Sequence, residues 1–128
     1  YVALLPYLPA TPQHEAAMAT LATRIRLWVR TPVTVNMGPR YLHSTGQLHK
    51  GGPATGVFVI ITASADSDVA IPGEAFGFGQ LNLAQAEGDY RVLAGLDRRV
   101  IRVHLSCPTD IGLEKLSACL ETDAMASG

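Results

Sequence analysis

Cysteine is scarce in this sequence. Among 128 residues there are two cysteines, Cys107 and Cys119, and their spacing matches neither a redox pair nor a metal-binding motif. Isolated cysteines are typical of free thiols in a reducing compartment, although a single Cys107–Cys119 bridge stays an alternative. We therefore predict free thiols and a cytoplasmic protein.

An excess of charge of either sign is also absent. Ten Lys and Arg residues against eleven Asp and Glu residues give a net charge of −1. Nucleic-acid surfaces and polybasic membrane patches both need clustered Lys and Arg, so we expect neither partner. The sequence has no apolar run near the ~20 residues that span a bilayer and no charged-then-apolar leader.

Apolar residues are plentiful, at 48% of the chain. This composition and this length predict one domain with a sizeable core. The chain starts at Tyr1, without Met, and enters an apolar segment at once. We therefore expect residues 1–128 to be one subdomain, the C-terminal piece of a longer enzyme, with the remainder of that enzyme as a partner.

The hydrophobic pattern alternates between strand-like and helix-like segments. Strand-like segments occupy residues 1–8, 33–38, 56–63 and 98–106. Helix-like segments occupy residues 9–31, a short stretch beginning near Leu42, residues 80–96 and residues 108–124. This order predicts an α/β fold with three layers, a doubly wound and mostly parallel sheet of about four to five strands.

Three local signals refine this prediction. Thr11 and Pro12 are typical of an N-cap and of the first helical position. The continuous apolar run of residues 56–63 predicts a central strand buried on both faces, whereas residues 98–106 alternate and predict a strand nearer the edge. Pro6 predicts the end of the first strand or an irregularity in it.

The stretch "LHSTGQLHKGGP", residues 42–53, concentrates polar side chains directly after the second predicted strand. Ligands of parallel α/β sheets bind beyond the carboxyl ends of the strands, where free backbone N–H groups also collect. Ser44 and Thr45 supply hydroxyls and Lys50 supplies positive charge, to which Arg40, just before this stretch, adds another. His43 and His49 exchange protons near neutral pH. The segment therefore favours an anionic, hydroxyl-rich ligand such as a sugar phosphate; capping and ordinary surface polarity stay as the alternative.

Other chemistries fit these residues poorly. His43 and His49 are six residues apart, which does not place two imidazoles on one helical face, so we predict no metal site. The Gly-x4-Gly-Lys-Ser/Thr spacing of a phosphate loop is missing. The "GFG" of residues 77–79 follows a long loop rather than a strand, which argues against dinucleotide binding.

The loop after the third strand contributes weaker candidates. Glu74 accompanies Asp66 and Asp68 there, and we include Glu74 among the catalytic candidates, although a lone loop carboxylate is more often solvated surface. Asn82 and Gln85 lie three residues apart and could bond hydroxyl groups from one helix face. Arg102 and His104 share one side of the last strand, and we interpret both as structural.

Four segments carry a family resemblance: "YVALLPYLP", "GPRYLHSTGQLHKGGPATGVFVIIT", "IPGEAFGFGQLNLAQAEGD" and "RRVIRVHLS". Over nearly all of its length the chain resembles the last part of the glucose-6-phosphate isomerase half of bifunctional transaldolase/glucose-6-phosphate isomerase proteins. "LHSTGQ" also resembles a segment of bacterial glucose-6-phosphate isomerases. The resemblance implies a sugar-isomerase fold and interconversion of glucose 6-phosphate and fructose 6-phosphate through a cis-enediol, without any metal or organic cofactor.

The resemblance also implies roles for individual residues. His43, Ser44 and Gln47 become candidates for the lining of the sugar site, and His49 and Lys50 for proton transfer and for stabilisation of an oxyanion or phosphate. Two departures stand out: Asn82 occupies the place of an expected Lys, and residues 40–42 offer no Glu. Complete isomerases of this kind have two such subdomains.

We therefore weigh three functions. The chain is part of an isomerase, a module that binds sugar phosphates without complete chemistry, or a structural subdomain. Because a subdomain separated from its partner exposes an apolar face, we also expect self-association into a homo-oligomer.

Overall fold

Strands and helices alternate along the chain in the predicted order. A computed structural model describes residues 1–64 and 67–126. Its strands are β1 (Val2–Tyr7), β2 (Val33–Val35), β3 (Val57–Ala63) and β4 (Arg99–Leu105). Its helices are α1 (Pro12–Val29), α2 (Thr45–Gly51), α3 (Phe78–Gly95) and α4 (Thr109–Ala126), and a 3-10 turn, η1 (Arg40–His43), precedes α2.

The strands form one sheet in the order β2-β1-β3-β4, and all neighbouring strands are parallel. From β1 the chain adds β2 on one side and then β3 and β4 on the other, which is the double winding that the sequence predicts. The register pairs Tyr7 with Thr62 and Thr62 with His104. These three residues form one row near the carboxyl ends of the strands.

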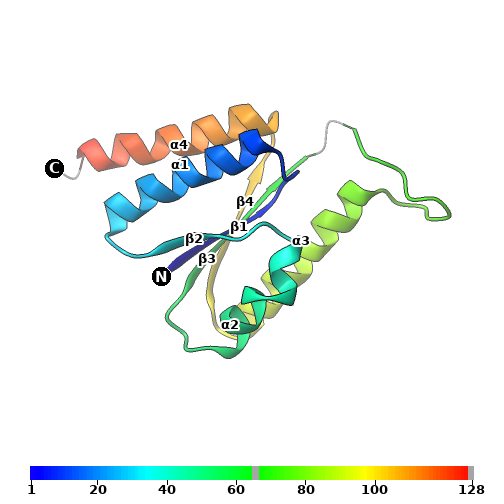
Figure 1. Ribbon diagram of the computed structural model, residues 1–128, viewed down its shortest axis with the longest axis horizontal. Helices are drawn as coiled ribbons and strands as arrows, with labels where there is room; N and C mark the ends of the chain where they lie inside the picture. The colour runs from blue at the N-terminus through cyan, green and yellow to red at the C-terminus, as the bar shows by residue number, and fades with distance from the viewer. Residues whose placement is uncertain (65–66, 127–128) are drawn as a thin grey trace.

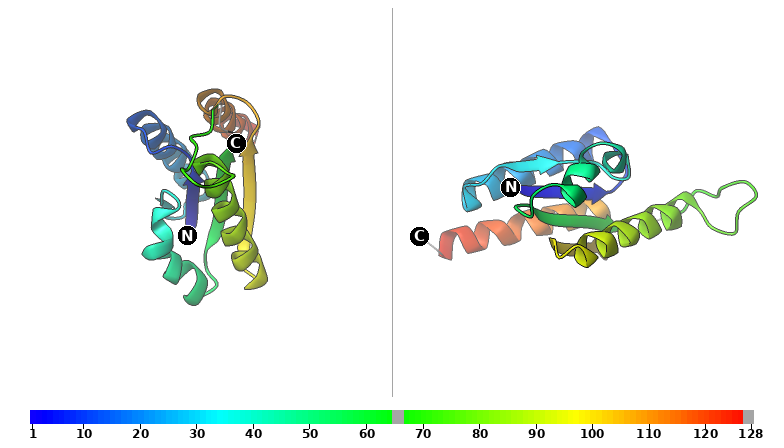
Figure 2. Two further views of the ribbon diagram at one scale, coloured as in Figure 1. Left: turned by 90° about the vertical axis from the view of Figure 1, so that its right-hand side faces the viewer. Right: turned by 90° about the horizontal axis from the view of Figure 1, so that it is seen from below.

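Helices cover both faces of the sheet (Figure 1). α1 and α4 lie side by side on one face, and α2 and α3 lie on the other (Figure 2). A core cluster fills each interface: Leu4, Met18, Leu21, Ile61 and Leu113 under α1 and α4, and Leu5, Tyr41, Phe58, Ile60, Ala86 and Leu93 under α2 and α3. The three-layer α/β prediction is confirmed.

The pattern of burial in β3 and β4 follows their positions. Phe58 and Ile60 of β3 face the α3 side and Ile61 faces the α1 side, and all three are buried. β4 borders the sheet, and most of its residues are exposed. The central and edge assignments of these two strands are therefore confirmed.

The start of α1 is as predicted, and its last turn is not. Thr11 Oγ1 accepts a hydrogen bond of 3.1 Å from the His14 amide, and Pro12 is the first helical residue. The helical spacing of Ala17, Leu21, Ile25 and Trp28 predicts one apolar stripe along this helix, but the Trp28 side chain is 49% exposed. Trp28 belongs to an exposed last turn with Leu27 and Val29, beyond the part of the helix that packs on the sheet.

β1 continues through Pro6, where the sequence predicts an end or an irregularity. The reason lies in β2, which stops at Val35 although the sequence predicts a strand to residue 38. Beyond β2 the Asn36 and Gly38 amides still donate to the carbonyls of Leu4 and Pro6, at 3.0 and 2.9 Å. Pro6 therefore faces irregular chain on that side and interrupts no ladder.

Both cysteines are free, as predicted. Within residues 1–64 and 67–126 there is no helix with the length and apolar character that crossing a membrane requires.

Candidate functional site

An open cleft of about 950 Å³ lies at the carboxyl edge of the sheet. Its walls come from the ends of β1 and β3, the turn after β2, the first turns of α3 and the start of α4. The polar and charged side chains in its lining are those of Tyr7, His14, Arg40, Ser64, Ser67, Asp68, Asn82, Gln85, Thr109 and Asp110. The cleft therefore occupies the position that the sequence predicts for a ligand, beyond the strand ends.

The charged side chains that line the cleft, except Arg40, interact with other groups that the structure describes. His14 Nε2 lies 3.2 Å from Asp110 Oδ1, and His14 Nδ1 lies 2.8 Å from the Pro9 carbonyl oxygen. Asp68 accepts hydrogen bonds from the backbone amides of Gly79 and Gln80, at 2.6 and 3.2 Å. Arg40 is exposed on η1 and forms no hydrogen bond or ion pair with any residue that the structure describes. Its guanidinium is thus available to an anion.

Asp68 also explains the "GFG" motif of residues 77–79. A Cβ atom on Gly77 would collide with the Asp68 carboxylate, and one on Gly79 would lie 3.0 Å from it. The glycines therefore let a carboxylate reach the amides at the positive end of α3. Their role here is to hold the loop after β3 against this helix.

Asn82 lines the cleft as predicted, but its side-chain amide nitrogen already donates a hydrogen bond within the protein. Asn82 Nδ2 donates to the Tyr7 carbonyl at 3.1 Å. The interaction ties α3 to the end of β1 and leaves the amide oxygen as the group that can accept a bond from a ligand.

The expectation that His49 and Lys50 open onto this cleft is wrong. The connection from β2 to β3 must return the chain to the amino edge, so α2 runs away from the cleft. The end of α2 is bound there by Arg98, whose Nη2 donates to the carbonyls of Lys50 and Gly52 at 2.7 and 2.8 Å. Only the start of the connection, with Arg40, reaches the carboxyl edge.

His49 is buried beneath α2 with 3% of its surface exposed. Its Nδ1 lies 2.9 Å from the Tyr1 hydroxyl oxygen, and its ring packs among those of Tyr1, Tyr41 and Phe58. Its Nε2 is buried and has no hydrogen-bond partner among the described residues. His49 is therefore placed as a core residue of the α2 layer, remote from the cleft.

Lys50 belongs to a buried polar chain centred on Asp89. Lys50 Nζ lies 2.7 Å from Asp89 Oδ1, and the Asp89 side chain is 1% exposed. The Tyr41 hydroxyl donates to Asp89 Oδ2, and the Tyr7 hydroxyl lies 3.1 Å from that of Tyr41. Burial raises the pKa of Tyr7 to about 12 and raises the pKa of Tyr41 further, so both hydroxyls stay protonated and act as donors.

Sequence reasoning missed Asp89, although a signal was present. Ala86, Asp89 and Leu93 recur at helical spacing on one face of α3, and all three are buried. A carboxylate at a core position of an amphipathic helix needs a buried partner, which Lys50 and Tyr41 provide here.

The remaining candidates are dispersed. His43, Ser44 and Gln47 are exposed, and Ser44 Oγ makes a long hydrogen bond of 3.4 Å to the Tyr41 carbonyl. Thr45 Oγ1 is buried without a partner among the described residues. Glu74 borders a separate hollow of about 330 Å³ with Asp68, Phe76 and Gln80, and Asp66 lies outside the described residues.

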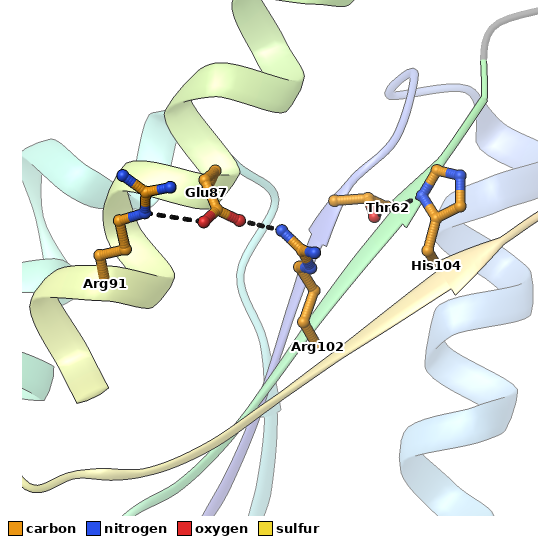
Figure 3. A network of polar contacts seen from close by, with 5 residues as sticks. All are labelled: Thr62, Glu87, Arg91, Arg102 and His104. Carbon is orange, nitrogen blue, oxygen red and sulfur yellow. Dashed lines mark hydrogen bonds and ion pairs between the residues drawn. The ribbon is translucent and has the colours of Figure 1, made fainter.

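A second polar group stands at the ends of β3 and β4. Thr62 Oγ1 lies 2.9 Å from His104 Nδ1 (Figure 3), and Ser64 Oγ lies 3.1 Å from His104 Nε2. Farther from the strand ends, Arg102 pairs with Glu87 of α3, which also accepts from Arg91 at 2.8 Å. Arg102 is thus structural as interpreted, whereas His104 contacts Ser64, a residue of the cleft lining.

Burial also gives His49 a predictable effect on stability. Desolvation, the largest influence, lowers the pKa of His49 from its ordinary value of 6.5. Below that value the unfolded chain binds a proton that the folded chain does not, so this residue makes the free energy of unfolding fall as the pH falls. We expect His49→Gln to flatten the decline below about pH 6.5 in urea unfolding. The variant His43→Gln, which changes an exposed histidine, should show the same decline as the unmodified protein. A His49→Gln variant whose free energy of unfolding falls with pH as steeply as that of the unmodified protein would contradict the prediction.

Among the side chains of residues 1–64 and 67–120 there is no group of three or more His, Cys, Asp or Glu arranged to hold a metal ion.

Comparison with known proteins establishes the fold and leaves the family open. Neither a family model nor a curated protein matches the chain. The crystal structure of a hypothetical protein from Thermus thermophilus matches 96% of this chain with a TM-score of 0.74 and 20% sequence identity. The match covers 34% of the Thermus chain, so this chain spans about a third of that protein's length.

Proposed function

We propose that this chain is the sugar-phosphate-binding subdomain of a glucose-6-phosphate isomerase. The proposal rests on the resemblance carried by "GPRYLHSTGQLHKGGP" and on a cleft at the ligand-binding edge of a parallel sheet. In this proposal the substrate is a phosphorylated sugar, which the polar lining of the cleft binds, and the enzyme is cytoplasmic.

The guanidinium of Arg40, which has no partner among the described residues, is the observation that carries the proposal. The carboxylates of the cleft are held by other groups, Asp110 by His14 and Asp68 by the α3 amides. Arg40 therefore supplies positive charge with no internal partner among the described residues. Guanidinium groups recognise phosphate through paired hydrogen bonds, while Asn82, Gln85 and Ser64 can bond the hydroxyls of a sugar.

Isomerisation needs more than this cleft offers. Moving a proton between C2 and C1 requires a base at carbon and stabilisation of the enediolate oxygens. His49 is buried and Lys50 is paired with Asp89, so neither reaches the cleft lining. We propose that the remainder of a longer enzyme, or another copy in a homo-oligomer, supplies these groups, and that no cofactor takes part.

A binding module without chemistry is the second candidate. Asn82 favours it, because an amide bonded to the Tyr7 carbonyl stands where the resemblance implies a Lys. The two candidates differ in one measurement on the full-length protein: incubation with fructose 6-phosphate in D2O, with NMR detection of deuterium at C2 of the glucose 6-phosphate formed. Incorporation supports the isomerase, and binding without incorporation supports the module.

Binding itself is tested on the 128-residue chain. We expect fructose 6-phosphate to shift NMR signals of cleft residues, and Arg40→Ala to weaken this binding by about 10- to 100-fold, because one charge-assisted contact is lost. Arg26→Ala removes an exposed arginine from the last turn of α1 and should leave binding unchanged. Equal binding of fructose without phosphate, or an unaffected Arg40→Ala variant, would refute the proposal.

A further inference from the structure

Ser64 and His104 form a polar pair that the sequence analysis did not assign to the cleft. Ser64 follows the last residue of β3 and lines the cleft, and its Oγ lies 3.1 Å from His104 Nε2. The other ring nitrogen, Nδ1, lies 2.9 Å from Thr62 Oγ1. The imidazole is therefore held between two hydroxyl groups, one at the cleft and one in the core.

The parallel register fixes this arrangement. Thr62 pairs with His104 across β3 and β4, and Thr62 is 2% exposed. In Figure 3 the two side chains extend toward each other from neighbouring strands, and Arg102, two residues before His104, turns to Glu87 instead. Arg102 is thus paired with Glu87, and the hydrogen bonds of His104 to described residues are those with the Thr62 and Ser64 hydroxyls.

This geometry suits proton transfer. When Nδ1–H donates to Thr62, the lone pair of Nε2 faces Ser64 and can accept its proton. A side chain aligned with a base, which is itself oriented by a third group, is the general arrangement of an activated hydroxyl. His104 is exposed, so the proton it takes up can pass to water.

We infer that Ser64 transfers a proton from a hydroxyl group of a bound phosphorylated sugar, with His104 as the accepting base and Thr62 as the group that fixes its tautomer. The inference rests on the proposed function for the identity of the ligand. Ser64 is the catalytic residue in this scheme because it lines the cleft; His104 and Thr62 act through it.

The simplest reaction that such a pair supports is the opening of the sugar ring. The anomeric hydroxyl gives its proton to Ser64 Oγ as Ser64 gives its own to His104 Nε2. The electron pair of the O–H bond forms the carbonyl, the bond from the anomeric carbon to the ring oxygen breaks, and the ring oxygen takes a proton from water. On closure the hydroxyl formed from the ring oxygen attacks either face of the carbonyl and gives its proton to solvent, while the carbonyl oxygen takes back the proton held by His104 through Ser64, so either anomer forms. No oxidation occurs.

The test is the exchange rate between the α and β anomers of glucose 6-phosphate, measured by NMR exchange spectroscopy with the 128-residue chain. We expect acceleration in proportion to protein concentration. Ser64→Ala and His104→Gln should each remove at least about 90% of it, since general acid–base groups contribute roughly 100-fold or more. Ser106→Ala changes an exposed serine just beyond β4 and serves as the matched control.

Two further readouts separate this role from a structural one. Thr62→Val removes the hydroxyl that holds Nδ1 of His104 and should lower the acceleration, while glucose 6-phosphate still binds. Binding of glucose 6-phosphate should stay within about twofold in His104→Gln, because His104 is not among the residues that line the cleft. Binding without acceleration, or acceleration that survives both substitutions, overturns the inference and leaves the proposed function standing; absence of binding overturns the proposed function.

Discussion

The free energy of unfolding should fall by about 3–5 kcal/mol when Asp89 is replaced by alanine, which is the usual cost of removing one partner from a buried ion pair. In the native protein the Asp89 carboxylate lies 2.7 Å from Lys50 Nζ and accepts a hydrogen bond from the Tyr41 hydroxyl. The substitution removes the carboxylate and leaves both groups without this partner. Urea unfolding followed by circular dichroism measures the change.

Two comparisons test the cause. Asp110→Ala removes a carboxylate whose side chain is 53% exposed, and its pairing with His14 predicts a loss of about 1 kcal/mol or less. The double variant Asp89→Leu/Lys50→Met removes both charges and should be more stable than Asp89→Leu alone. A loss of stability that is equal in the single and double variants would show that packing, not the unpaired charge, sets the cost.

Replacement of Phe58 by alanine should cost about 3–5 kcal/mol, as for other large-to-small changes in a core. Phe58 is 1% exposed in the central strand and supports the α2 layer through its contacts with the Tyr1 and His49 rings. The ring fills the space between the sheet and α2, so truncation leaves a cavity and loses burial. Urea unfolding again gives the free-energy difference.

Phe78→Ala is the matched control for Phe58. Phe78 begins α3 with 54% of its surface exposed, so its truncation should change stability by about 0.5 kcal/mol or less. If Phe58→Ala is too unstable to purify, Phe58→Leu should show a smaller loss, below about 1.5 kcal/mol. A cost for Phe78→Ala equal to that for Phe58→Ala would contradict the assignment of Phe58 to the core.

The fold follows from the sequence because its signals are local. Continuous apolar residues in 57–61 require burial on both faces, and Thr11 with Pro12 marks the start of α1. The extent of β2 could not be obtained this way, because its end depends on backbone bonds from Asn36 and Gly38 to β1. Such bonds are tertiary and leave no pattern in the sequence.

The site is harder to predict from the sequence, because it depends on the direction in which α2 runs and on the register between β3 and β4. Arg40 and Asn82 were placed correctly at the cleft, since each lies close to the carboxyl end of a strand. The positions of His49 and Lys50 do not follow from the sequence, because no local signal shows that α2 carries the end of the polar segment to the amino edge of the sheet. The Ser64–His104 contact depends on the pairing of β3 with β4, 40 residues apart in sequence.

The edge strands of the sheet, β2 and β4, could in principle pair with a strand of another chain. β2 is three residues long, which offers little template for another chain. β4 is longer, but its exposed Arg99 carries a charge that no carboxylate among the described residues balances. A copy approaching in register would bring like charges together, so polymerisation through the sheet margins is disfavoured without any covering element.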